Sequence, residues 1–170
     1  MSTRLNILGG RDRNGERECV ASLALHAGES LTVAGPTGSG KSELLADIEQ
    51  LADGDTPSGR GVSITRNGAA ASRHGLVATL SQRTHFIMDA RGGEFAALHA
   101  ARLGKAGRDW AAETVALANR LCGEPMTGQS LLQRLSGGQT RALMIADIAL
   151  ISDAPVVLID EVENAGIDKH

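Results

Sequence analysis

Residues 35–42 have the residue types and spacing of a loop that binds phosphate groups, G-x-x-x-x-G-K-[ST]. In order they are Gly35, Pro36, Thr37, Gly38, Ser39, Gly40, Lys41 and Ser42. Glycines carry no Cβ, so successive backbone N–H groups can converge on an anion. A lysine adds positive charge, and a hydroxyl can ligate Mg²⁺. We therefore predict a nucleotide phosphate site here; the alternative is an ordinary glycine-rich turn before a helix.

A second candidate anion site lies at residues 135–139, Leu-Ser-Gly-Gly-Gln, which precede an apolar stretch with helical spacing. The hydroxyl of Ser136, the free amides of Gly137 and Gly138, and the helix dipole would converge at the helix start. Taken alone, however, Ser-Gly-Gly is also simply a good N-cap, and this interpretation stays open.

Two carboxylates, Asp160 and Glu161, follow the apolar run Val156–Ile159. Four consecutive apolar residues are typical of a strand buried on both faces of a parallel sheet. Buried carboxylates at the end of such a strand are unfavourable unless they bind a ligand or pair with an opposite charge. Asp160 suits a Mg²⁺ shell and Glu161 suits the polarisation of an attacking water. The alternative is a strand that ends in a polar turn.

The elements that must position these residues can be predicted from periodicity and turn signals. The phosphate loop is expected between a buried strand at 31–34 and a helix from Lys41 to about Leu51. Further strands are expected at 4–8, 19–25, 61–65 and 76–80, and helices at 93–101 and 109–121, with Asp109 as an N-cap.

Composition limits the class of protein. With 170 residues, 42% of them apolar, the chain is expected to form one domain with its own core. A net charge of −3 provides no overall attraction to nucleic acid or to an anionic membrane, so no nucleic-acid partner is expected. Cys19 and Cys122 lack metal-ligand spacing. No signal peptide or membrane-spanning run is evident, so a soluble, cytoplasmic chain is predicted.

Taken together, the phosphate loop (Walker A), Gln82, residues 135–139 (the LSGGQ signature) and Asp160–Glu161 (Walker B) resemble the ATP-binding cassette (ABC) family in order and approximate spacing. The resemblance implies an α/β fold: a P-loop NTPase mixed or parallel sheet with flanking helices, an N-terminal antiparallel β portion and a helical insertion. It divides the chain into a first part of the nucleotide-binding core (1–88), a helical insertion (89–134) and the signature helix with the Walker B strand (135–170).

The resemblance also implies roles for individual residues. Lys41 and Ser42 would hold phosphate and Mg²⁺. Gln82 would sense Mg²⁺ and the attacking water, Asp160 would support Mg²⁺, and Glu161 would be the catalytic base. In this family two cassettes pair head to tail. Ser136, Gly137, Gly138 and Gln139 of one cassette would then bind the ATP held by the other, in a homodimer or with a paired cassette.

Some features depart from the family pattern. Residues 1–34 contain no aromatic side chain to stack on adenine, so Arg11 or Arg13 could stack instead. The loop at 164–168, which resembles the dimer-contact loop, is one residue longer than usual. The switch histidine and the last strands of the family would follow Asp168, and His170 comes too early to be that histidine. The resemblance therefore predicts a cassette truncated at its C-terminus.

The function expected from the resemblance is that of the ATP-hydrolysing subunit of a transporter, with ATP and Mg²⁺ bound. A membrane permease would be the partner, and would hold the chain at the inner face of the membrane. One alternative is a soluble, non-transport cassette ATPase in remodelling or cofactor assembly. Another is a fragment that binds ATP without turnover.

Overall fold

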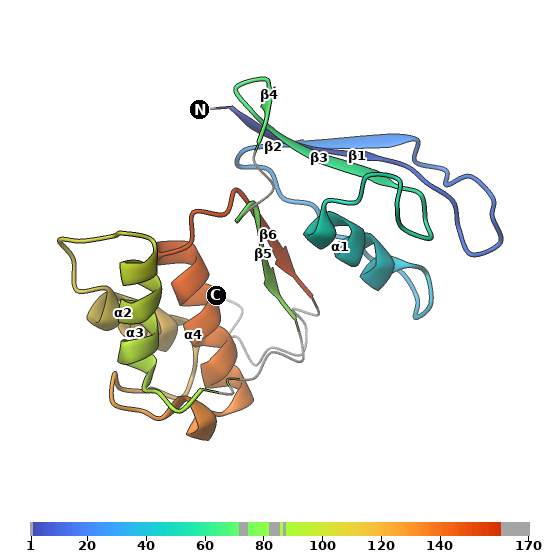
Figure 1. Ribbon diagram of the computed structural model, residues 1–170. Helices are drawn as coiled ribbons and strands as arrows, with labels where there is room; N and C mark the ends of the chain where they lie inside the picture. The colour runs from blue at the N-terminus through green and yellow to red at the C-terminus, as the bar shows by residue number, and fades with distance from the viewer. Residues whose placement is uncertain (1, 72–74, 82–85, 87, 161–170) are drawn as a thin grey trace. The chain divides into compact units, whose positions relative to one another are not determined.

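The computed structural model describes residues 2–71, 75–81, 86 and 88–160, which fall into two compact units (Figure 1). We call the first the sheet unit; its described residues are 2–71, 75–78 and 154–158. We call the second the helical unit; its described residues are 79–81, 86, 88–153 and 159–160.

An antiparallel sheet of four strands forms one layer of the sheet unit (Figure 1). The strands are β1 (Thr3–Leu8), β2 (Ser22–His26), β3 (Gly61–Arg66) and β4 (Ala69–Ala70), in the order β2-β1-β3-β4. The predicted strands at 4–8 and 61–65 are confirmed, β2 begins later than the sequence suggested, and the short β4 was not predicted.

The core of the sheet unit forms where this sheet meets helix α1 (Lys41–Gln50). Successive side chains of a strand point to opposite faces of the sheet, and in β1 and β3 one face buries Leu5, Ile7 and Ile64. Helix α1 contributes Ile48 to the same core. The helix ends at Leu51, which has a positive φ of 52° and whose N–H is bonded to carbonyls of the last turn. The predicted helix from Lys41 to about Leu51 is confirmed.

A second sheet consists of β5 (Val77–Leu80) and β6 (Val156–Ile159). The N–H of Val156 donates to Leu76 O at 3.2 Å and that of Asp160 donates to Leu80 O at 2.9 Å, so the two strands run parallel. Val157 is 44% exposed and Ile159 43%. The prediction that this strand is buried on both faces is therefore wrong for the described residues, where β5 is its one paired neighbour.

The strand predicted at 31–34 is not formed. These four residues have no strand geometry, and Leu31 and Val33 are 47% and 40% exposed. An apolar run becomes a buried strand only where neighbouring strands supply hydrogen bonds and cover its side chains. None of the described strands pairs with this segment. The phosphate loop therefore follows an exposed segment without regular secondary structure, and the prediction of a buried strand before it is wrong.

The helical unit is built from α2 (Gly92–Arg102), α3 (Trp110–Leu121) and α4 (Gly137–Leu150), with a short 3₁₀ helix, η1 (Leu132–Arg134), before α4 (Figure 1). Its largest cluster of buried residues contains Ala118, Ala142 and Ala146 around the fully buried Leu143. Small side chains let the helices approach closely around this leucine. Asp109 caps α3 by accepting the Ala112 N–H at 3.0 Å, as predicted.

Candidate functional site

The phosphate loop passes directly into α1 through two glycines with left-handed backbone conformations. Gly38 has a φ of 84° and Gly40, the N-cap of α1, has a φ of 88°. Side chains strongly disfavour this region, which explains why glycine is needed at both positions. No side chain caps the start of α1. The first-turn N–H groups are therefore available for an anion, and the helix dipole favours negative charge at the same point.

Lys41 folds back across the loop that it follows. Its Nζ donates to the carbonyls of Gly35 at 2.8 Å and Pro36 at 2.9 Å. The loop itself is tightened by the Ser39 N–H, which donates to Pro36 O at 3.2 Å. Thr37, Ser39 and Ser42 are all exposed. The loop thus combines an ammonium group, backbone donors and accessible hydroxyls, which are the groups that recognise a phosphate chain with its cation.

Residues 136–139 form the start of α4. Ser136 is the N-cap: its hydroxyl accepts the Gln139 N–H at 3.3 Å, and its own N–H donates to Gln139 Oε1 at 3.0 Å. Gln139 Nε2 also donates to the carbonyls of Glu124 and Pro125, both at 3.3 Å. This reciprocal capping box confirms the N-cap interpretation of the serine. Ser136 and Gly137 are exposed, and a Cβ at Gly137 would meet open space.

The acidic end of β6 is described only in part. Asp160 is half-buried, and its backbone N–H donates to Leu80 O at 2.9 Å. Glu161 and Gln82, the predicted catalytic base and water sensor, lie outside the described residues, as do the loop at 164–168 and His170. The structure thus gathers residues 35–42 into one loop of the sheet unit and residues 136–139 into one helix start of the helical unit.

Two buried ionic clusters were not predicted from the sequence. Arg60, 5% exposed, lies between Glu18 and Asp47 in the sheet unit, and His99 pairs with the buried Asp147 in the helical unit. Hydrogen bonding to Arg60 lowers the pKa of Glu18, whereas burial raises the pKa of Asp147. The available signal was an aspartate set directly between alanine and isoleucine in a helix, which distinguishes Asp47 and Asp147 but does not identify their partners.

None of the helices in the described residues is long and apolar enough to cross a membrane. The same residues contain no group of three or more His, Cys, Asp or Glu side chains that could hold a metal ion on its own. Magnesium at nucleotide sites commonly takes one or two protein ligands and completes its shell with substrate phosphates and water. A serine hydroxyl, as at Ser42 in the sheet unit, and a carboxylate, as at Asp160 in the helical unit, are each the kind of oxygen ligand that Mg²⁺ accepts.

Comparison with known proteins places these features in a family. A family model described as ABC transporter matches residues 20–164. An uncharacterized ABC transporter ATP-binding protein of Methanocaldococcus jannaschii is 47% identical over 173 residues, which cover 98% of this chain. The macrolide export ATP-binding/permease protein MacB of Nitrobacter winogradskyi is 36% identical over 153 residues, which cover 82% of this chain. The chain spans 66% of the length of the first protein and 22% of the second.

Solved structures are also similar. A Pyrococcus furiosus protein assigned to the ABC transporters as an ATP-binding protein gives a TM-score of 0.67 at 21% identity, covering 98% of this chain and 78% of that one. CbiO1 of Clostridium perfringens, part of the ABC transporter complex CbiONQ, gives 0.64 at 20% identity, covering 96% of this chain and 67% of that one. At these identities the likeness concerns the fold alone, and it confirms the predicted α/β fold class.

Proposed function

The chain belongs to the ABC transporter family, and we propose that it binds Mg-ATP at residues 35–42 and hydrolyses it to ADP and phosphate. The structure at the start of α1 is the main support for this proposal. There a glycine N-cap leaves the first-turn N–H groups without a side-chain cap, and Lys41 lies over the same loop. Donors, positive charge and helix dipole all favour a chain of phosphates at this point.

On binding, the ammonium of Lys41 would exchange the carbonyls of Gly35 and Pro36 for oxygens of the β- and γ-phosphates. Charged acceptors form stronger hydrogen bonds than carbonyls, so the exchange is favourable. The hydroxyl of Ser42 and the carboxylate of Asp160 would hold Mg²⁺, which neutralises charge on the phosphates when bound. Gln82 would contact the attacking water, and Glu161 would accept a proton from that water as it attacks the γ-phosphorus and the bond to ADP breaks.

We further propose that a second cassette completes the site. Ser136 and Gly137 are exposed at the start of α4, and its N–H groups and dipole suit an anion. One chain thus carries two candidate anion sites of different kinds. A head-to-tail pair would use both, each nucleotide being held by residues 35–42 of one cassette and covered by residues 136–139 of the other.

A membrane permease is the proposed partner. MacB is by name an ATP-binding/permease protein, and CbiO1 is part of an ABC transporter complex. By this proposal the chain works at the cytoplasmic face of a membrane, and the permease crosses the bilayer.

Phosphate release from Mg-ATP tests the hydrolysis. We expect the wild-type chain to release phosphate. The Glu161→Gln variant should bind ATP but release no phosphate. Glu16→Gln is the matched control, because Glu16 is exposed in a turn of the sheet unit and should leave turnover unchanged. Light scattering after size exclusion should show Glu161→Gln as a dimer with Mg-ATP and as a monomer without it. Turnover by Glu161→Gln at the wild-type rate would contradict the proposed role of Glu161.

A further inference from the structure

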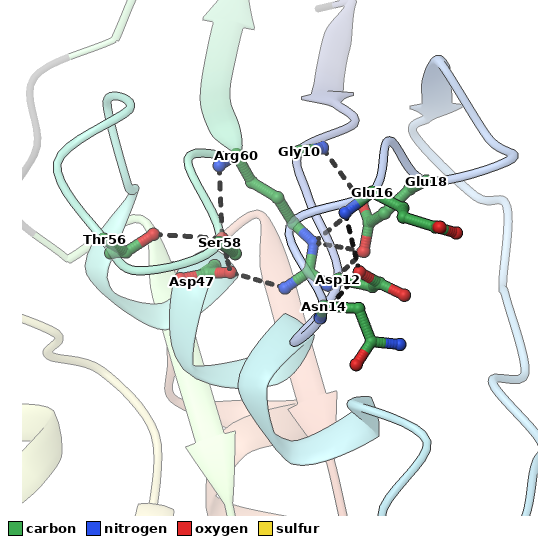
Figure 2. Close-up of polar contacts among 9 residues, drawn as sticks. All are labelled: Gly10, Asp12, Asn14, Glu16, Glu18, Asp47, Thr56, Ser58 and Arg60. Carbon is green, nitrogen blue, oxygen red and sulfur yellow. Dashed lines mark hydrogen bonds and ion pairs between the residues drawn. The ribbon is translucent and has the colours of Figure 1, made fainter.

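A cluster of buried charges connects three segments of the sheet unit (Figure 2). Arg60, Asp47 and Ser58 are 5%, 3% and 2% exposed, and Glu18 completes the cluster. Burial of charge is unfavourable unless each group is paired and hydrogen-bonded. The cluster joins the loop at 9–18, helix α1, and the connection before β3.

One edge of the Arg60 guanidinium holds α1. Its Nη1 donates to Asp47 Oδ2 at 2.6 Å, and the Ser58 hydroxyl donates to the same oxygen at 2.8 Å. The Arg60 N–H in turn donates to Ser58 Oγ at 3.1 Å. Asp47 lies six residues after Lys41 on the same helix, about 9 Å along its axis. The carboxylate is therefore anchored less than two turns from the residues that would bind phosphate.

The other edge of the guanidinium holds the loop at 9–18. Arg60 Nε donates to Glu18 Oε1 at 3.2 Å and Oε2 at 3.1 Å, and Nη2 donates to Oε1 as well. The Gly10 N–H donates to Glu18 Oε2 at 3.0 Å. Because the guanidinium is planar and its donors are fixed, this fork sets orientation as well as distance.

Backbone contact reinforces the anchor. The Arg11 N–H donates to Ser58 O at 2.7 Å. A Cβ at Gly10 would lie 2.1 Å from that same carbonyl, so the loop backbone lies directly against residue 58. The loop, the connection before β3 and α1 are thus held together both by the ion pairs and by close backbone packing.

We propose that Arg60 is a positioning residue for the phosphate loop. By holding Asp47 against the loop at 9–18, it fixes the direction of α1 and hence of the N–H groups around Lys41. Apolar side chains often replace buried ion pairs without loss of stability, so the ion pairs need not be kept for stability alone. The planar guanidinium has donors in fixed directions, which an apolar side chain lacks. This inference rests on the proposed function, since it assumes that phosphates bind at the start of α1.

The test compares Arg60→Met and Arg60→Lys with the wild-type chain. Arg108→Met is the matched control, because Arg108 also forms a two-pronged pair with a glutamate, Glu113, but on the surface of the helical unit. Affinities for Mg-ATP and for inorganic tripolyphosphate are measured by calorimetry, at a temperature where circular dichroism shows each variant folded. NMR signals of the Gly38 and Gly40 amides report on the loop itself.

For Arg60→Met we expect both affinities to fall by the same factor, on the order of tenfold, because the lost positioning acts on the phosphates and not on the base. The amide signals of Gly38 and Gly40 should shift. Arg60→Lys should recover part of the affinity, since an ammonium can still reach one carboxylate but cannot form the fork. Arg108→Met should match the wild type in every readout.

Wild-type affinities and unshifted amide signals in a folded Arg60→Met variant would overturn the positioning role. If that variant does not fold, Glu18→Gln provides the second test. It keeps Arg60 beside Asp47 and weakens only the ion pair between Arg60 and the loop at 9–18. We expect it to bind tripolyphosphate about threefold more weakly, and an unchanged affinity would overturn the proposal. Absence of Mg-ATP binding by the wild type would overturn the proposed function together with this inference.

Discussion

The pair of His99 on α2 and Asp147 on α4 makes the stability of the helical unit depend on pH in a defined direction. His99 Nδ1 and Asp147 Oδ2 are 2.7 Å apart, and the aspartate side chain is 6% exposed. Within the described residues, its other oxygen, Oδ1, is buried without a hydrogen-bond partner. Burial raises the pKa of Asp147, while the charge of His99 and its hydrogen bond oppose that rise.

Replacing His99 with alanine removes the partner and leaves the carboxylate buried. Loss of one partner from a buried hydrogen bond costs about 1–3 kcal/mol. The His99 side chain is 29% exposed, so water can replace part of the lost contact and the lower half of that range is expected. For a chain of this length each kcal/mol lowers the melting temperature by about 2–4 °C.

The sign of the pH dependence follows from the raised pKa of Asp147. A carboxyl whose folded-state pKa is raised stabilises the fold below its unfolded pKa, and this contribution is lost as pH rises through the folded pKa. Without His99 the pKa of Asp147 should rise further, because both opposing effects disappear. The penalty of His99→Ala should therefore be largest near neutral pH and should shrink on acidification, as the carboxyl protonates.

Urea denaturation of the wild type and His99→Ala near neutral pH and at about pH 4.5 measures this difference. His26→Ala, at an exposed position at the end of β2, is the control for loss of a histidine. In Asp147→Asn the His99 substitution should have an effect that no longer depends on pH in this range. An equal loss of stability in His99→Ala at both pH values, or no loss near neutral pH, would refute the dependence on protonation of Asp147.

Three further substitutions, one of them with a matched control, test the local structure. Gly40→Ala should destabilise the chain by about 1–2 kcal/mol through its φ of 88°, and a stability equal to wild type would show that the start of α1 is not strained. Leu143→Ala, at a side chain 0% exposed, should lose about 2–5 kcal/mol in chemical denaturation, whereas Leu98→Ala, 59% exposed, should change stability by no more than about 0.5 kcal/mol. Asp109→Ala should lose about 1 kcal/mol as the cap of α3, and amide exchange in the first turn should accelerate; unchanged exchange would argue against the cap.

The parts of the structure that were predictable from sequence are governed by neighbours in the chain. The turn into α1 needs glycine at Gly38 and Gly40, and the caps at Asp109 and Ser136 bond to amides three residues ahead. Such signals are contained in short segments, so sequence spacing alone locates them. The family resemblance, carried by several short motifs in order, was predictable for the same reason and is confirmed by the match over residues 20–164.

The features that sequence missed depend on residues distant in the chain. The run at 31–34 has the composition of a strand but no partner among the described strands. Val157 and Ile159 of β6 are exposed, although both faces of that strand were predicted to be covered. Arg60 meets Glu18 across 42 positions, and His99 meets Asp147 across 48. The residues beside a charged side chain in the sequence can indicate that it is buried. Which charged side chains pair with each other is determined only by the fold.

Titration calorimetry of Mg-ATP into the wild-type chain, Lys41→Ala and the control Lys105→Ala tests the central claim most directly. Lys105 pairs with Asp153 in the helical unit and should be dispensable for binding. We expect Lys41→Ala to lose about 1.5–3 kcal/mol of binding free energy, roughly a 10- to 150-fold weaker affinity, because a charge-assisted contact to phosphate is lost. No binding by the wild type, or equal affinity in Lys41→Ala, would contradict the claim that residues 35–42 hold the nucleotide.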